Sequence, residues 1–269
     1  MKQVDRNVRS NDLSIAWPFA FTSVQLNRDT SLLKLIAMVT MLIDHAGKIL
    51  FPQLPFMRVI GRLAFPLYAY CIAVGCVYTR NPLKYLSRIV LLALISQPIY
   101  AVALRHTVPS MYAYSFAEQP LRAAWTFYLG SWNHPSILVS LAAGVVLITT
   151  LKEKRISLFL GTALLCWIAQ RYFDYGWRGL ALMLLFYLCS NTRWLAIPVL
   201  VAYMIWWGAQ GTGYSLFGLK FGIQMFAALA LPLIFINTHS KMRMSKIFAY
   251  AFYPAHCAVI WALSELLLK

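Results

Sequence analysis

Long apolar runs dominate this sequence and limit what it can fold into. Several extend over 18 or more residues with few charges, the length that an α-helix needs to cross the hydrocarbon core of a bilayer. Hydrophobic residues make up 61% of the 269 and charged residues only 12%, which excludes an ordinary soluble domain. The sequence predicts an all-α integral membrane protein, a polytopic bundle of about nine transmembrane helices. We expect the spans near residues 31–51, 57–79, 82–104, 133–151, 156–172, 175–190, 193–208, 221–237 and 245–267.

The chain divides into a short polar start and one membrane domain. Residues 1–30 are polar and basic and are expected to form a cytoplasmic or interfacial N-terminal segment, followed by a membrane domain over residues 31–269. The apolar patch at residues 15–21 is too short to span and lacks a small-residue cleavage site, so it does not indicate a signal peptide. Five cysteines stand singly in apolar runs, which indicates buried small side chains and no disulfide framework.

Basic residues exceed acidic ones by 24 to 8, giving a net charge of +16. In a membrane protein this excess first reports topology, because cytoplasmic loops collect Lys and Arg, and it does not indicate a nucleic-acid partner. With the N-terminus inside, 15 of the 24 basic residues fall on the cytoplasmic side and 9 on the other. We therefore predict a cytoplasmic N-terminus. The aromatic-rich loop 105–132 then faces outward and suits a lid at the membrane interface.

The first expected span carries Lys34, Asp44 and His45, although charged groups in a bilayer are costly. On a helix, Lys34 and His45 lie about 20° apart in azimuth and about 16 Å apart along the axis. This describes one stripe with a cation at one end and an imidazole at the other. Asp44 points about 100° away, so its expected partner is Lys48. Alternatively, Lys34 snorkels to the headgroups and His45 is a satisfied interhelical residue.

Two further groups of cations invite both a functional and a topological interpretation. Arg62, near the outer boundary, could stabilise an oxyanion or simply snorkel. Arg80, Lys84 and Arg88 open a cytoplasmic helix, where they could hold a phosphate or only direct topology.

Other polar residues have adequate structural explanations. Asn133, before Pro135, is expected to cap a helix, and Asp174 with Tyr175 opens another. Tyr253 and His256 lie in the last span, where a second intramembrane imidazole is harder to dismiss and either residue could orient His45. The five histidines lack paired spacing, so no metal site is predicted.

Together these motifs resemble a known family. Lys34 and His45 match the basic-x10-His signature of the large membrane acyltransferase superfamily. The wider set resembles the TraX family of conjugative pilin acetyltransferases over nearly the whole chain from residue 30. The matching stretches are Leu-Ile-Asp-His at 42–45, Gly-Arg-Leu-Ala-Phe-Pro-Leu at 61–67, Thr-Arg-Asn at 79–81 with 84–88, Asp-Tyr-Gly at 174–176, and Phe-Tyr-Pro-Ala-His at 252–256. The sequence departs from the family pattern after Asn133, where His-Pro-Ser replaces apolar residues.

The resemblance implies acetyl transfer from acetyl-CoA, used as a co-substrate with no bound cofactor, to the N-terminal amine of a processed pilin subunit in the bacterial inner membrane. Lys34, Arg80, Lys84 and Arg88 would then hold the CoA phosphates. His45 would act as general base beside Asp44, and Arg62 would stabilise the oxyanion. Asn133, Asp174, Tyr175, Tyr253 and His256 would support the acceptor and the base.

Two alternatives remain open at this stage. One is a membrane O-acyltransferase that modifies a glycan of the cell envelope. The other is a non-enzymatic membrane component or transporter that uses Asp44, His45 and Asp174 as a proton relay.

Overall fold

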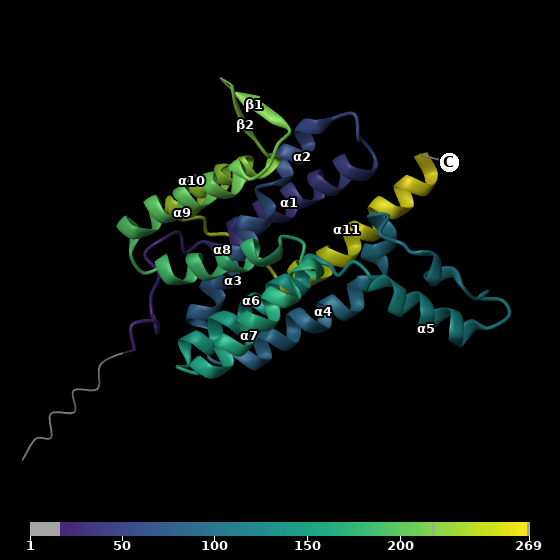
Figure 1. Ribbon diagram of the computed structural model, residues 1–269, viewed down its shortest axis with the longest axis horizontal. Coiled ribbons are helices and arrows are strands. Elements are labelled where there is room, and N and C mark those ends of the chain that lie inside the picture. Colours follow the sequence, from purple (N-terminus) through teal and green to yellow (C-terminus); the bar gives the residue numbers. More distant parts are fainter. Residues whose placement is uncertain (1–16, 217, 268–269) are drawn as a thin grey trace, which may run out of the picture.

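The computed structural model describes residues 17–216 and 218–267 and shows an elongated helical bundle (Figure 1). Its α-helices, in chain order, are α1 (Thr30–Ile49), α2 (Pro55–Gly61), α3 (Ala64–Tyr78), α4 (Pro82–Ala103), α5 (Pro120–Ser131), α6 (Ile137–Lys152), α7 (Ile156–Ile168), α8 (Gly176–Cys189), α9 (Arg193–Ala209), α10 (Leu231–Phe235) and α11 (Lys246–Leu267). Short 3-10 helices follow at η1 (Pro109–Tyr112), η2 (Gln170–Tyr172) and η3 (Ile223–Ala230).

The all-α prediction is confirmed in its main part, but nine spanning helices are not. Within the described residues, three segments are long and apolar enough to cross a membrane: Pro55–Tyr78, Pro82–Ala103 and Lys246–Leu267. The apolar helices α6, α7, α8 and α9 are shorter, and the expected span 221–237 is divided between η3 and α10. Helix ends set by polar residues fall close to the expected positions. Asp29 caps α1 by accepting from the Leu32 amide at 3.2 Å, and Asn81 caps α4 by accepting from the Lys84 amide at 2.8 Å.

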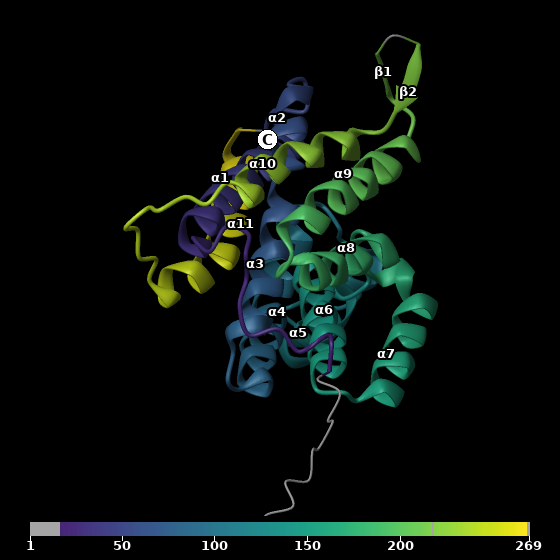
Figure 2. The same cartoon turned by 90° about the vertical axis from the view of Figure 1, so that its left-hand side faces the viewer.

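Two features lie outside the expected pattern. The stretch 105–132, expected as a loop, contains η1 and α5, which pack on each other. Helix α5 also packs on α4, and it projects from the bundle (Figure 1). Between α9 and η3 a small antiparallel hairpin forms from β1 (Tyr214–Leu216) and β2 (Leu219–Phe221), with Gly218 at a φ of +81° (Figure 2). Glycine tolerates this left-handed conformation, which a tight hairpin turn requires.

The described part of the N-terminal segment lies across one end of the bundle. The Trp17 indole donates to the Leu151 carbonyl at 2.8 Å, and the Gln25 amide donates to the Ser190 carbonyl at 2.8 Å. Val24, Leu26 and Asn27 are fully buried there. This end therefore brings together the start of α1 and the ends of α6 and α8. Lys2, Arg6 and Arg9 lie outside the described residues.

The core of the bundle is formed by α1, α3, α4, α6, α8, α9 and α11 together with η3 and α10, and α7 lies at its edge (Figure 2). Its fully buried side chains include Tyr70, Phe186 and Tyr187. All five cysteines are free and buried, as predicted. Pro98, Pro198 and Pro254 stand inside helices, whereas Pro66 and Pro232 fall in first turns, where the missing amide proton costs little.

Candidate active site

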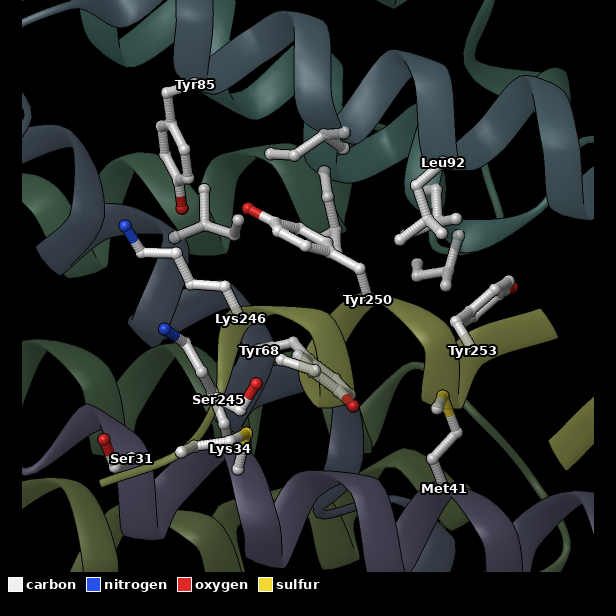
Figure 3. A pocket seen from close by; sticks show the side chains of 17 residues that line it. Ser31, Lys34, Met41, Tyr68, Tyr85, Leu92, Ser245, Lys246, Tyr250 and Tyr253 are labelled. Atoms are coloured by element: carbon white, nitrogen blue, oxygen red, sulfur yellow. The ribbon is translucent and has the colours of Figure 1, made fainter. Parts of the chain in front are cut away.

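An apolar pocket of about 180 Å³ lies between α1, α3, α4, α6 and α11. The amines of Lys34 and Lys246 gather at one end of it near the Tyr85 hydroxyl, while Met41 and Tyr253 lie at the other end (Figure 3). The long wall between these ends is mostly aliphatic and aromatic. This arrangement suits an extended molecule with an anionic end and a less polar arm.

A polar pocket of about 220 Å³ adjoins the first. Met41, Tyr68, Ile137 and Tyr253 line both, so they form the place where the two pockets meet. The polar pocket also holds charged, imidazole and phenol side chains, namely Asp44, His45, Lys48, Arg58, Arg62, Tyr100, His106, Asp174 and Tyr175. Lys34 and His45, on one helix, therefore line the two adjoining pockets.

The hydroxyl of Tyr253 is buried at this meeting point and has no hydrogen-bond partner among the described residues. The Ser136 hydroxyl lies nearby, but the two make no hydrogen bond of normal geometry. A buried donor without a partner is costly, so an unpaired phenol at a pocket wall indicates a place for a ligand acceptor.

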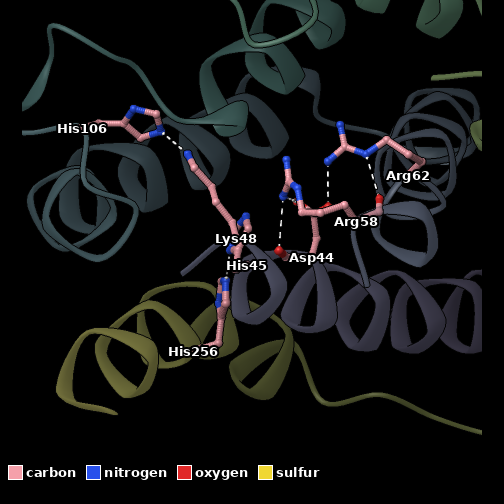
Figure 4. Close-up of polar contacts among 7 residues, drawn as sticks. All are labelled: Asp44, His45, Lys48, Arg58, Arg62, His106 and His256. Carbon is pink, nitrogen blue, oxygen red and sulfur yellow. Dashed lines mark hydrogen bonds and ion pairs between the residues drawn. The ribbon is translucent and has the colours of Figure 1, made fainter. Parts of the chain in front are cut away.

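His45 is oriented by a chain of two hydrogen bonds. Its Nδ1 lies 2.9 Å from Nε2 of His256 (Figure 4), and Nδ1 of His256 lies 2.9 Å from the Phe252 carbonyl oxygen. Because a carbonyl only accepts, Nδ1 of His256 must donate, which leaves its Nε2 as an acceptor when the ring is neutral. His45 then donates from Nδ1, and its own Nε2 carries a free lone pair. The geometry thus assigns the tautomer that a general base needs.

The expected partner of Asp44 was wrong. Its carboxylate binds Arg58 at 2.5 Å and Arg62 at 2.7 Å, both from the chain that turns back after α1, and not Lys48 (Figure 4). Lys48 instead lies 3.0 Å from Nε2 of His106. Asp44 therefore holds the two guanidinium groups at the polar pocket. The Nη2 atom of Arg62 is occupied by its ion pair with Asp44.

His106 follows α4 and stacks on His134, with ring centroids 4.4 Å apart. Buried Gln97 fixes this corner, because its amide donates to the carbonyls of Ser131 and His134 and accepts from the Ser136 amide at 2.9 Å. Burial, followed by the charge of Lys48, lowers the pKa of His106 to about 4, so the ring is neutral at physiological pH. A neutral His106 can accept a hydrogen bond from the Lys48 ammonium.

Asp174 and Tyr175 enter the polar pocket from the chain before α8. The Tyr175 ring stacks on Phe65, with centroids 4.1 Å apart, and meets Trp207 edge-on. The side chain of Asp174 is accessible from the pockets that it lines. Many protein atoms surround its carboxyl, however, and the resulting desolvation raises the pKa of this carboxyl to about 6. Lys48 and Arg62 oppose that rise, whereas Asp44 adds to it.

The remaining predicted residues lie elsewhere. Arg80 lines a separate pocket with Arg155, and Lys84 and Arg88 are exposed and line neither the apolar nor the polar pocket. The expected cap at Asn133 was wrong, because α6 begins at Ile137 with Ser136 in the cap position. Asn133 itself is exposed and lines neither pocket.

Three side chains lie close enough together to coordinate a metal ion. Nitrogen atoms of His45 and His256 and the sulfur of Cys257 all lie within 4.8 Å of one another. Two of these atoms are already joined by the hydrogen bond between the histidines, so an ion would have to replace its proton.

Apolar helices that enclose a histidine pair and a cationic pocket define the class: a helical membrane protein with a buried polar site. The family described as "TraX protein" matches residues 29–264, and the chain belongs to this family.

Two curated relatives match over shorter stretches. The chain is 33% identical over 73 residues to the probable fimbrial assembly protein FimC, serogroup H1, of Dichelobacter nodosus, covering 26% of this chain and 30% of that protein. It is 49% identical over 39 residues to the uncharacterized protein RP591 of Rickettsia prowazekii (strain Madrid E), covering 14% of this chain and 16% of that protein. The matches thus span less than a third of either relative. No solved structure matches the chain.

Proposed function

We propose that this protein transfers an acetyl group from acetyl-CoA to the N-terminal amine of a processed pilin subunit in the bacterial inner membrane. Membership of the TraX family supports a role with pili, as does the name of the matching fimbrial assembly protein. The observation that carries the chemistry is the meeting of the two pockets, with Lys34 and Lys246 at the far end of one and His45 in the other.

The apolar pocket fits the donor. The two lysine amines would bind CoA phosphates by charge-assisted hydrogen bonds, and the pantetheine arm would pass along the apolar wall toward Tyr253. The thioester carbonyl would then lie where the pockets meet, within reach of the unpaired Tyr253 hydroxyl. Arg62 and Tyr253 are the donors available to stabilise its developing negative charge.

The polar pocket fits the acceptor and the base. The acceptor ammonium group would first lose one proton to water, and the free Nε2 of His45 would accept a second proton from the nitrogen as it attacks the thioester carbon. The new C–N bond forms as the C–S bond breaks, and the thiolate leaves as CoA after taking up the proton from His45. No acyl-enzyme is needed, because a bound thioester and a deprotonated amine react directly.

The test uses purified protein in nanodiscs with acetyl-CoA and processed pilin, with the acetylated fraction read by intact mass spectrometry. Loss of a general base lowers the rate by about 10²- to 10⁴-fold, which we expect for His45→Ala. His239→Ala, at an exposed histidine outside both pockets, is the matched control. Near-normal acetylation by His45→Ala would remove this histidine from the mechanism.

The other candidate functions are separated by the same assay. Consumption of acetyl-CoA with acetyl recovered on a glycan hydroxyl, and none on pilin, would establish the O-acyltransferase. A protein that turns over no acetyl-CoA with either acceptor would fit a transporter. The two ion pairs of Asp44 do not favour a proton relay, since both of its carboxylate oxygens are already bound to arginines.

A further inference from the structure

A third pocket, of about 340 Å³, opens beside the polar pocket at the start of α8. Asp174 and Tyr175 line both, so the two pockets adjoin there. Its other walls come from the turn before α8, from α8 and α9 and from η3, and they comprise Gln170, Gly176, Trp177, Arg178, Trp207 and Gln224. Nothing in the proposed reaction yet uses this space.

Two side-chain donors in this pocket have no partner. The Nε of Arg178 and the amide nitrogen of Gln224 are both buried and make no hydrogen bond among the described residues. Folded proteins pair nearly all such groups, so two orphan donors in one pocket indicate a ligand that supplies acceptor oxygens. Asp174 lines the same pocket, and its carboxylate oxygens can accept hydrogen bonds from a ligand.

The pocket is rigidly walled. The Arg178 guanidinium carbon lies 5.8 Å from the ring centres of both Trp177 and Trp206, and the Arg178 carbonyl accepts from the Tyr203 hydroxyl at 2.7 Å. Tyr175 is held against Phe65, as described above. An Arg178 side chain held in this way selects for the position of the oxygen atom that it binds.

Tryptophan side chains also indicate where the third pocket lies relative to the membrane. Trp167, Trp177 and Trp206 pack in a row beside it, and Trp167 and Trp206 are 54% and 41% exposed. Indole rings concentrate at the boundary between hydrocarbon and headgroups. A ligand at this depth is therefore best supplied by a chain that is itself held in the membrane.

We propose that the third pocket is the acceptor-peptide subsite. It would take the first residues of a membrane-anchored peptide, with backbone carbonyl oxygens on Arg178 and Gln224 and the terminal ammonium group at Asp174, facing the polar pocket. This rests on the proposed acetyl transfer and adds its acceptor specificity. Carbonyl oxygens, which only accept, match two orphan donors better than sugar hydroxyls, each of which must also donate.

The test compares two acceptors, a decapeptide with the pilin N-terminal sequence and glycinamide, which lacks the later carbonyls. Arg178→Lys keeps the charge but loses Nε, and Gln224→Met keeps the size but loses the amide. We expect each variant to raise the KM for the decapeptide about 10-fold or more, with little change for glycinamide or acetyl-CoA. Arg193→Ala, exposed at the start of α9, should match wild type for all three.

The outcomes are distinct. Variants that fold, judged by an unchanged KM for acetyl-CoA, but keep the decapeptide KM within twofold of wild type would overturn the subsite. Equal losses with all three substrates would assign the two residues a purely structural role and overturn it as well. If wild-type protein acetylates neither acceptor, the proposed function fails instead. Binding of a fluorescent decapeptide to wild type and variants, measured without acetyl-CoA, then still decides the subsite.

Discussion

The backbone of Gly61 faces the carboxylate of Asp44 so closely that a β-carbon on Gly61 would lie 2.0 Å from Oδ1 of Asp44. That contact joins α2 to α1 directly beside the two arginines that Asp44 binds. Glycine at this position is what lets the short α2 approach the charged turn of α1. The approach therefore depends on the absence of one side chain.

Gly61→Ala is expected to push α2 away from α1 and to lower stability by about 1–3 kcal/mol, the usual cost of overpacking. Gly161→Ala in α7 is the matched control, because a β-carbon there meets nothing within 4 Å. Alanine also favours a helix by about 0.5–1 kcal/mol over glycine, so this control should be neutral or stabilising. Thermal unfolding in detergent measures both, and equal melting temperatures would contradict the packing argument.

Asp44→Asn should destabilise the protein far more than loss of a surface ion pair. It leaves two arginines without a counter-charge, and Arg62 and Asp44 are each only 12% exposed. Breaking such a buried pair costs about 3–5 kcal/mol. Glu153→Gln, which removes an exposed pair with Arg155, should cost about 0–1 kcal/mol. Similar denaturation midpoints for the two variants would show that Asp44 is dispensable to the fold.

The location of the CoA phosphates can be decided between two groups of basic residues, the lysines at the apolar pocket and the cluster at residues 80–88. Lys34→Gln and Lys246→Gln should each raise the KM for acetyl-CoA about 10-fold or more, because both amines lie at the apolar pocket. Lys84→Gln, at an exposed side chain that lines neither pocket, should change it little. The reverse order would return the phosphates to the cluster at residues 80–88.

Acceptor binding should weaken as the pH falls through about 6. The raised pKa of Asp174, about 6, means that its carboxylate is ionised above that pH and neutral below it. Only the ionised form attracts an ammonium group, so the KM for the decapeptide should rise below pH 6. Lys48, Arg62 and Asp44 are the charged groups that face the same carboxyl. A pH profile unchanged in Asp174→Asn would exclude this role.

The N-terminus should be cytoplasmic and residues 105–132 periplasmic. Single cysteines at residues 5 and 118, in a background lacking the five buried cysteines, can be probed on spheroplasts with an impermeant thiol reagent. Labelling at 118 alone is the expected result. Labelling at 5 alone would invert the topology. The two sites report the same orientation independently, which serves as the internal control.

The sequence predicted helices best where one long apolar run decides the structure. The observed α1, α4, α7, α8, α9 and α11 begin within two residues of their expected positions, because polar residues adjoin uniform apolar runs. The break at Arg62, helix α5 and the hairpin at 214–221 were missed. They depend on turns and on packing against other helices, which produce no long hydrophobic period.

For the candidate site, the sequence identified His45 and His256 because imidazoles are unusual in apolar helices. It missed the partners of Asp44, since one helix was considered alone. Arg58 and Arg62 stand four residues apart, which was a usable signal that both could reach one carboxylate. Gln97 and His106 gave no such signal, because their roles arise only when α4 meets the turn before α6.

His256 lies 211 residues after its partner His45, on a helix that follows all the others in the described chain. At about 5–20 residues per second, a ribosome needs about 10–40 s to make the intervening chain. During that time α1 is already synthesised, while its imidazole has no neighbour to fix its tautomer. The histidine pair therefore cannot form until α11 has been synthesised, and a nascent chain that ends before α11 carries His45 without the partner that orients it.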